Sequence, residues 1–375
     1  MKKIYLDNAA TTALRPEVAQ EMMYVLQNEY GNPSSSHSFG RSAKSKLELS
    51  RKTIAQLFNV SASEIIFTSG ATEANNWILQ NAVVHLNVKR IITTKVEHHA
   101  VLHAVEFLQK QYGIQVDFVS IKSDGSIDIK HLMELLREDV STLVSLMHVN
   151  NETGIILDLE EIAAICKQHS VYFHSDTVQS IGKMELDLQQ VSVDFVVASA
   201  HKFHGPKGAG FAFIRKGIAM HSIFQGGEQE KGVRPGTESL HNIVGMAKAL
   251  QLAYQNAASE RSQIQALKDY TVVQLQKHFP EVAFNGALRK SLYTILNVRL
   301  PLDASKSGML LFNLDMKGIA VSRGSACQSG SARPSHVLAE FLNQEEVAKP
   351  SIRISFSHLS TQKEIDVLIE ALLAL

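Results

Sequence analysis

Cysteine and tryptophan are scarce in this chain, which has two cysteines and one tryptophan among its 375 residues. The cysteines, Cys166 and Cys327, are far apart in the sequence. Widely spaced cysteines without the signature of a secreted protein do not indicate a disulfide framework. We therefore expect no disulfide and at least one free thiol.

Long apolar runs are absent as well. The N-terminal segment carries Lys2 and Lys3 and reaches Asp7 before an apolar stretch of signal-peptide length can form. No other segment has the roughly 20 apolar residues that a membrane-spanning helix requires. We therefore expect a cytoplasmic protein without a membrane partner.

The chain also lacks net charge, because 37 lysines and arginines balance 37 aspartates and glutamates. A balanced charge gives no electrostatic basis for binding nucleic acid or an anionic membrane surface. Internal repeats and low-complexity segments are missing too. These absences favour an enzyme that acts on a small molecule.

Strand-like and helix-like segments alternate through the first two thirds of the chain. Such alternation predicts an α/β fold, with a large, mostly parallel sheet that carries helices on both faces. The predicted strands are residues 65–69, 90–96, 115–121, 142–149, 171–175, 195–198 and 209–214. The predicted helices include residues 16–27, 42–58, 100–112, 129–137 and 159–169.

The last third has a different pattern, with short strands and helices that predict a smaller α+β domain. A long helical region, residues 240–278, leads into it. We predict a large domain of residues 14–255 and a small domain of residues 1–13 and 256–375. The strands expected in the small domain are residues 293–299, 318–321 and 351–356, and its helices are residues 307–316 and 362–373.

Lys202 follows a buried, β-branched strand directly. Because an ionised lysine is costly to desolvate, a lysine in this position either extends its ammonium into water or has a lowered pKa and acts as an amine. The first alternative is an ordinary surface lysine. The second describes a lysine that forms a Schiff base with a carbonyl group.

A glycine turn, Gly70-Ala71-Thr72, joins a predicted strand to a predicted helix. Free backbone N–H groups at a helix N-terminus suit a phosphate, although the same sequence also fits an ordinary turn capped by Thr72. Other polar residues follow successive strands: His98, Asn151, Asp176 and Gln179. In a parallel sheet these strand ends lie at one edge, where ligands bind.

Pyridoxal 5′-phosphate would give each of these residues a role. Asp176 would hold the ring nitrogen in its protonated form, and His98 would stack on the ring. Gln179 or Asn151 would contact the ring oxygen. The phosphate would be bound by the glycine turn with Ser199 and His201.

Ten motifs now identify a resemblance, and they extend over almost the whole chain. They are Tyr5-Leu6-Asp7-Asn8-Ala9-Ala10-Thr11-Thr12, Gly31-Asn32-Pro33-Ser34-Ser35, Thr68-Ser69-Gly70-Ala71-Thr72-Glu73, Glu97-His98, His148-Val149-Asn150-Asn151-Glu152, Asp176-Thr177-Val178-Gln179, Ser199-Ala200-His201-Lys202, Arg234-Pro235-Gly236-Thr237 and Ser325-Ala326-Cys327 with Ile352-Arg353-Ile354-Ser355. With them, the chain resembles the pyridoxal-phosphate-dependent cysteine desulfurases of group I, within the class V aminotransferases.

The resemblance implies a fold-type I transferase that converts L-cysteine to L-alanine and keeps the sulfur as a persulfide. It also implies a homodimer, and a protein sulfur acceptor or scaffold for iron–sulfur cluster, thio-cofactor or tRNA synthesis. The implied catalytic residues are Cys327, Lys202 and His98. The implied cofactor contacts are Ala71, Thr72, His98, Asn151, Asp176, Gln179, Ser199, His201 and Lys202, with Thr237 from the other subunit. The implied substrate contacts are Asn8, Asn151 and Arg353.

The two cysteines have different surroundings. Cys327 lies in a segment of small and polar residues, 323–333, which we expect to form a mobile loop that can present a thiol to the cofactor and then to an acceptor. Cys166 lies on the apolar stripe of a predicted helix. We therefore expect Cys166 to be a core residue and Cys327 to be the nucleophile.

Three alternatives remain. A metal enzyme could use His99 with His103, or His201 with His204, although no carboxylate completes a ligand set and we expect no metal. A scaffold or sensor could bind the cofactor without turnover. A selenocysteine lyase or a cysteine-sulfinate desulfinase could share the same cofactor chemistry.

Overall fold

The structure is a computed structural model that describes residues 3–324 and 334–375. Its main sheet has seven strands in the order β2-β8-β7-β6-β5-β3-β4. Strands β7, β6, β5, β3 and β4 run parallel, whereas β8 is antiparallel to both of its neighbours. The predicted large, mostly parallel sheet is confirmed. Its strands are β2 (Ile65–Thr68), β3 (Arg90–Thr93), β4 (Gln115–Phe118), β5 (Thr142–Ser145), β6 (Tyr172–Asp176), β7 (Phe195–Ser199) and β8 (Gly210–Ile214).

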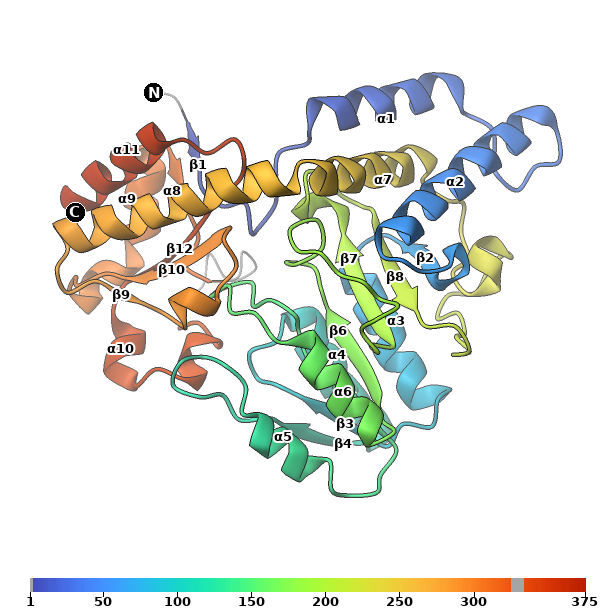
Figure 1. The fold of residues 1–375 in the computed structure, drawn as a ribbon, viewed down its shortest axis with the longest axis horizontal. Helices are drawn as coiled ribbons and strands as arrows, with labels where there is room; N and C mark the ends of the chain where they lie inside the picture. Colours follow the sequence, from blue (N-terminus) through green and yellow to red (C-terminus); the bar gives the residue numbers. More distant parts are fainter. Residues whose placement is uncertain (1–2, 325–333) are drawn as a thin grey trace.

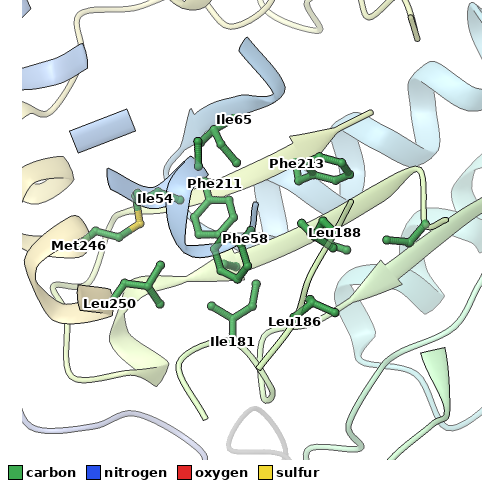
Figure 2. Close-up of a cluster of buried hydrophobic side chains, with 14 of the residues drawn as sticks. Ile54, Phe58, Ile65, Ile181, Leu186, Leu188, Phe211, Phe213, Met246 and Leu250 are labelled. Carbon is green, nitrogen blue, oxygen red and sulfur yellow. The ribbon is translucent and has the colours of Figure 1, made fainter. Parts of the chain in front are cut away.

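Helices cover both faces of this sheet because consecutive strand residues point to opposite sides. Ile91 packs with α3 and α4, whereas Ile92 packs in the cluster on the other face. Figure 2 shows part of that second cluster, where Phe58 and Phe211 lie against Leu250. The helices are α1 (Pro16–Asn28), α2 (Ser38–Leu57), α3 (Ala71–Val84), α4 (His99–Tyr112), α5 (Ile129–Leu135), α6 (Leu159–Gln168) and α7 (Leu240–Gln255).

A smaller α+β part lies beside the main sheet, at the left of Figure 1. It has an antiparallel sheet in the order β12-β10-β9 and a parallel pair formed by β1 and β11. One further hydrophobic cluster fills it. Its elements are β1 (Ile4–Tyr5), α8 (Ala257–His278), β9 (Ala283–Phe284), β10 (Ile295–Arg299), α9 (Leu310–Met316), β11 (Ile319–Ala320), α10 (Gln344–Ala348), β12 (Ser351–Ser355) and α11 (Gln362–Leu373).

The structure refines two predicted elements. The long helical region is divided at Asn256, which ends α7 and begins α8, and Figure 1 shows these helices end to end, with α7 beside the main sheet and α8 beside the small sheet. The second helix begins at Ser38 rather than at residue 42, because the His37 side chain accepts a hydrogen bond from the Gly40 N–H and caps it. The division into domains after residues 13 and 255 stays a prediction.

Short 3-10 helices connect the longer elements. They are η1 (Ala62–Glu64), η2 (Ala200–Lys202), η3 (Gln229–Gly232), η4 (Leu288–Lys290), η5 (Ala304–Gly308) and η7 (Leu338–Glu340). Among the helices that the structure describes, none combines the length and apolar character needed to cross a membrane.

Candidate functional site

Lys202 ends η2, which continues directly from the buried strand β7. Its side chain is half-buried, and its Nζ donates hydrogen bonds of 2.8 Å to the carbonyl oxygens of Ala9 and Ala10. The ammonium group therefore contacts the backbone of the N-terminal segment, which lies across the end of β7. Sequence patterns could not have indicated these two carbonyl acceptors.

The N-terminal segment also fixes the turn that carries Lys202. The Thr12 N–H and the Thr12 hydroxyl both donate to the His201 carbonyl at 2.9 Å. The same hydroxyl accepts a hydrogen bond of 2.7 Å from the His204 N–H. Three hydrogen bonds from one threonine hold the backbone on both sides of Lys202.

A cavity of about 240 Å³ opens at the carboxyl ends of the parallel strands. This is the edge of the sheet where the sequence predicts a ligand site. The cavity brings together most of the residues predicted to bind cofactor or substrate, which are Ala71, Thr72, His98, Asn151, Asp176, Gln179, Ser199, His201, Lys202 and Arg353.

Asp176 ends β6 and is 6% exposed. Its Oδ2 accepts a hydrogen bond of 2.8 Å from Asn75 Nδ2, and its Oδ1 accepts one of 3.1 Å from the Val178 N–H. These donors orient the carboxylate on the cavity wall. A carboxylate held in this way can accept a hydrogen bond from a protonated ring nitrogen.

The glycine turn begins α3, and its residues Ala71 and Thr72 line the same cavity. Gly70 has a φ of 153°, a conformation that residues with a side chain rarely adopt. The Ala71 N–H donates to the Ser199 hydroxyl at 2.8 Å, which joins the turn to the end of β7. The helix N-terminus, the Thr72 hydroxyl and the His201 ring together form a wall suited to an anion.

Burial favours the neutral forms of the two histidines of the cavity by lowering their pKa values. Burial lowers the pKa of His98, and the positive charge of Lys202 adds to this effect, while Asp176 opposes it. Burial, followed by the charge of Lys202, lowers the pKa of His201 to about 4. His98 also caps α4, because its Nδ1 accepts a hydrogen bond of 3.1 Å from the Ala100 N–H. An uncharged imidazole ring fixed by its own helix can stack on a planar ligand.

Arg353 lies in β12 and is 1% exposed. Its Nη2 forms an ion pair of 2.9 Å with Asp7 Oδ1, and its Nη1 donates to the Asn151 carbonyl at 2.7 Å. Its Nε has no hydrogen-bond partner among the described residues. The guanidinium is therefore fixed in place and still has N–H groups that can bind a carboxylate.

Two predicted residues do not line this cavity, and a third is not among the described residues. Asn8 lines a second cavity, of about 30 Å³, which also contacts Lys202, and its Nδ2 donates to the Ser355 carbonyl at 2.9 Å. Thr237 is exposed and does not line the 240 Å³ cavity. Cys327 lies outside the described residues.

Cys166 is 1% exposed in α6, which confirms the prediction that it is a core residue. Burial raises the pKa of its thiol to about 12, and the negative charge of Asp194 adds to this effect. A thiol with this pKa stays protonated at neutral pH, and a protonated thiol is a poor nucleophile.

Sequence reasoning missed other polar residues around the cavity. Asn75, which orients Asp176, lies one helical turn after Ala71 in α3, whereas Lys183 lies four residues after Gln179 in a segment of turns. The helical spacing of four residues could have indicated Asn75. In the part of the chain that the structure describes, no group of three or more histidine, cysteine, aspartate or glutamate side chains could hold a metal ion. His99 and His103 instead stack, with ring centroids 4.8 Å apart.

Comparison with known proteins gives consistent matches over the whole length. The Aminotransferase class-V family profile matches residues 4–368. Cysteine desulfurase IscS from Clostridium botulinum (strain Kyoto / Type A2) is 38% identical over 374 residues, which cover 99% of this chain and 94% of that protein. Cysteine desulfurase IscS from Dictyoglomus turgidum is 39% identical over 373 residues, with the same two coverages.

Solved structures agree with the sequence matches. A NifS-like protein has a TM-score of 0.91 and 34% identity, with 100% of this chain and 99% of that chain covered. A NifS-like protein from Rickettsia africae ESF-5 has a TM-score of 0.88 and 33% identity, with 99% and 98% covered.

Proposed function

Because this chain belongs to the aminotransferase class-V family, we propose that it is a cysteine desulfurase that converts L-cysteine to L-alanine and retains the sulfur as a persulfide. The observation that carries the proposal is the meeting of Lys202 and Asp176 on one cavity, at the carboxyl edge of the sheet. An amine and a buried carboxylate are the two groups that a pyridoxal-type cofactor requires.

The cavity fits pyridoxal 5′-phosphate as the cofactor. Asp176 would accept from the protonated ring nitrogen, and Asn75 keeps that carboxylate in place. The first turn of α3, with Thr72 and Ser199, would hold the phosphate. His98 would cover the ring face. When bound, the cofactor withdraws electrons from the substrate and so makes the Cα proton acidic.

The protein residues then bind the substrate and move the protons. Arg353 would bind the carboxylate of L-cysteine through its free N–H groups, with Asn151 beside it. Lys202 would hold the cofactor covalently and, once released by the substrate amine, would remove the Cα proton and return it. The carbonyls of Ala9 and Ala10 keep its amine at the cavity wall.

The sulfur step rests on the sequence, which supplies Cys327 as the nucleophile. Its thiolate would attack the sulfur of the substrate. The Cβ–S bond of the substrate breaks, a new S–S bond forms, and Cβ gains a proton. One cysteine and one enzyme thiol thus give one alanine and one enzyme persulfide, without an external oxidant or reductant.

We also propose a homodimer in which Thr237 contacts the phosphate bound by the partner subunit. Thr237 is exposed in one chain and lies away from the cavity, as a residue that acts across an interface would. A protein sulfur acceptor, such as an iron–sulfur scaffold or a thiolation enzyme, would take the persulfide sulfur.

The proposal is tested by incubating the purified protein, loaded with pyridoxal 5′-phosphate, with L-cysteine. The parent should be yellow, release alanine and gain one sulfur on Cys327 by peptide mass spectrometry. Lys202→Ala should lose alanine release, because Lys202 is the one lysine among the described residues that line the cavity. Normal alanine release by Lys202→Ala would contradict the proposal.

A further inference from the structure

Lys183 lies four residues after Gln179, in the turn segment between β6 and β7, and it does not line the 240 Å³ cavity itself. Its Nζ donates hydrogen bonds of 3.1 Å to both the side-chain Oε1 and the backbone carbonyl of Gln179. Its own backbone carbonyl accepts a hydrogen bond of 3.3 Å from the Tyr293 hydroxyl. The neighbouring Met184 carbonyl accepts one of 3.2 Å from the Tyr254 hydroxyl. Two tyrosines therefore hold the backbone that carries this lysine.

The contacts of Gln179 determine the orientation of its side-chain amide, with the oxygen towards Lys183 and the nitrogen towards Ala9. An ammonium group donates hydrogen bonds and cannot accept them, so the end that faces Lys183 must be the oxygen. The other end lies 2.9 Å from the Ala9 carbonyl, which can only accept, so it must be the nitrogen. A reversed amide would place two donors against each other at Lys183 and two acceptors against each other at Ala9.

The amide nitrogen is on the cavity side, because it contacts Ala9, which lines the 240 Å³ cavity, whereas the oxygen contacts Lys183, which does not line it. The Gln179 NH₂ group has two N–H bonds, of which one donates to the Ala9 carbonyl. Gln179 lines the cavity, so its second N–H is available to a ligand. The same Ala9 carbonyl accepts from Lys202 Nζ at 2.8 Å, so Gln179 and Lys202 share one acceptor, and Lys183 is joined to them through Gln179.

We propose that Lys183 is a positioning residue, which fixes the Gln179 amide so that the cavity presents an N–H donor to an anionic oxygen of the ligand. This inference rests on the proposed function, in which that oxygen is the ring oxygen of pyridoxal 5′-phosphate. Lys183 acts only through Gln179.

Burial and the neighbouring charges set the pH below which Lys183 is an ammonium group. Burial, followed by the positive charges of Lys202 and Arg353, lowers the pKa of Lys183 to about 7. Below that pH the side chain is an ammonium and can only donate. Lys183 also contributes to the lowered pKa of His201 and His204. The charged and titratable groups that share the adjacent 30 Å³ cavity are Arg15, Lys202, His204, Glu260, Tyr293 and His358.

The experiment measures the dissociation constant of pyridoxal 5′-phosphate for apo-protein at pH 6, by absorbance titration, together with kcat and KM for L-cysteine. Lys183→Met should weaken cofactor binding about tenfold, the effect expected when a hydrogen bond to a charged group is lost. Lys183→Arg should restore most of the affinity, because arginine also donates and cannot accept.

Two variants of Gln179 test the direction of the amide. Gln179→Glu keeps the partner of Lys183 but replaces the N–H donor by a carboxylate oxygen. It should weaken binding at least tenfold, as Gln179→Ala should. If the oxygen faced the ligand instead, Gln179→Glu would bind nearly as well as the parent, and the proposal would be wrong. These variants decide the question even if Lys183→Met does not fold.

A double-mutant cycle separates positioning from general stability. If Lys183 acts through Gln179, the double variant Lys183→Met with Gln179→Ala should bind no more than about twofold more weakly than Gln179→Ala alone. Additive losses of about a hundredfold would overturn the proposal.

Lys268→Met is the matched control. Lys268 is a buried lysine of α8 whose Nζ donates to the Ser291 hydroxyl and the Leu292 carbonyl, and burial lowers its pKa to about 8. Its replacement should lower stability and leave the cofactor affinity unchanged. If the parent binds the cofactor and releases alanine, and Lys183→Met binds the cofactor equally well, only the inference about Lys183 is refuted. A parent that does neither would refute the proposed function.

Discussion

Arg353 Nη2 lies 2.9 Å from Asp7 Oδ1, an ion pair between residues 346 positions apart in the sequence. Asp7 also accepts a hydrogen bond of 2.9 Å from the Ser322 hydroxyl, so its carboxylate contacts two segments of the smaller α+β part. The pair fixes the orientation of the Arg353 guanidinium beside the cavity. Arg353 is 1% exposed, so its guanidinium is oriented by these protein contacts and not by surrounding water.

Replacement of Arg353 by lysine should therefore affect substrate binding more than chemistry. Lysine keeps the charge but cannot contact Asp7, the Asn151 carbonyl and a substrate carboxylate together. We expect KM for L-cysteine to rise about tenfold or more, with a smaller change in kcat, as measured by steady-state alanine release. Arg299→Lys is the control. Arg299 lies in β10 of the same small sheet and forms a partly exposed ion pair with Glu346. An unchanged KM in Arg353→Lys would remove Arg353 from the substrate site.

The two cysteines should respond differently to replacement by serine. Cys327→Ser should still bind the cofactor and L-cysteine but should form no persulfide, because the proposed nucleophile is missing. Cys166→Ser should turn over like the parent and lose about 1 to 3 kcal/mol of stability, since its buried hydroxyl would lack a partner. Peptide mass spectrometry after a pulse of L-cysteine locates the added sulfur. Sulfur on Cys166 would contradict the assignment.

Thr237 can be tested by mixing subunits. If it contacts the partner's cofactor, a hybrid dimer of one Lys202→Ala subunit and one Thr237→Ala subunit contains one complete site. The hybrid should then show about half the activity of the parent dimer, although both parental variants are impaired. The measurement uses differently tagged subunits purified as the mixed dimer. Activity no higher than that of the variants would show that Thr237 acts within its own chain or not at all.

Buried histidines should make the fold sensitive to mild acid. His174 is fully buried beside Asp176, and burial lowers its pKa from 6.5 to about 4. Between these values the unfolded chain binds a proton that the native chain does not, so stability rises with pH and is lost as the pH falls from about 6.5 towards 4. This one histidine contributes about 1.4 kcal/mol per pH unit in that window.

Urea unfolding at pH 7 and pH 5 checks this expectation. His174→Asn should reduce the difference in unfolding free energy between the two pH values, whatever it does to stability at pH 7. His278→Asn, at an exposed position in the last turn of α8, should leave the difference unchanged. An equal pH dependence in His174→Asn and the parent would contradict the prediction.

The main sheet could be predicted from the sequence because its strands alternate with amphipathic helices and end in polar residues. The same reasoning placed Asp176, Gln179 and Lys202 at one edge, where the cavity lies. It could not find the carbonyls of Ala9 and Ala10, because backbone groups leave no mark in the sequence. It also could not find the break at Asn256, because no proline or glycine marks that position in the sequence.

The position of Lys202 has a consequence for synthesis on the ribosome. The carbonyls that hold its amine come from the first ten residues, and the guanidinium at the far side of the cavity comes from β12, residues Ser351–Ser355. A nascent chain that already contains the main sheet would therefore still lack Arg353 in the cavity lining. Binding of the substrate carboxylate is then expected only after translation of β12, and prematurely terminated chains should release no alanine from L-cysteine.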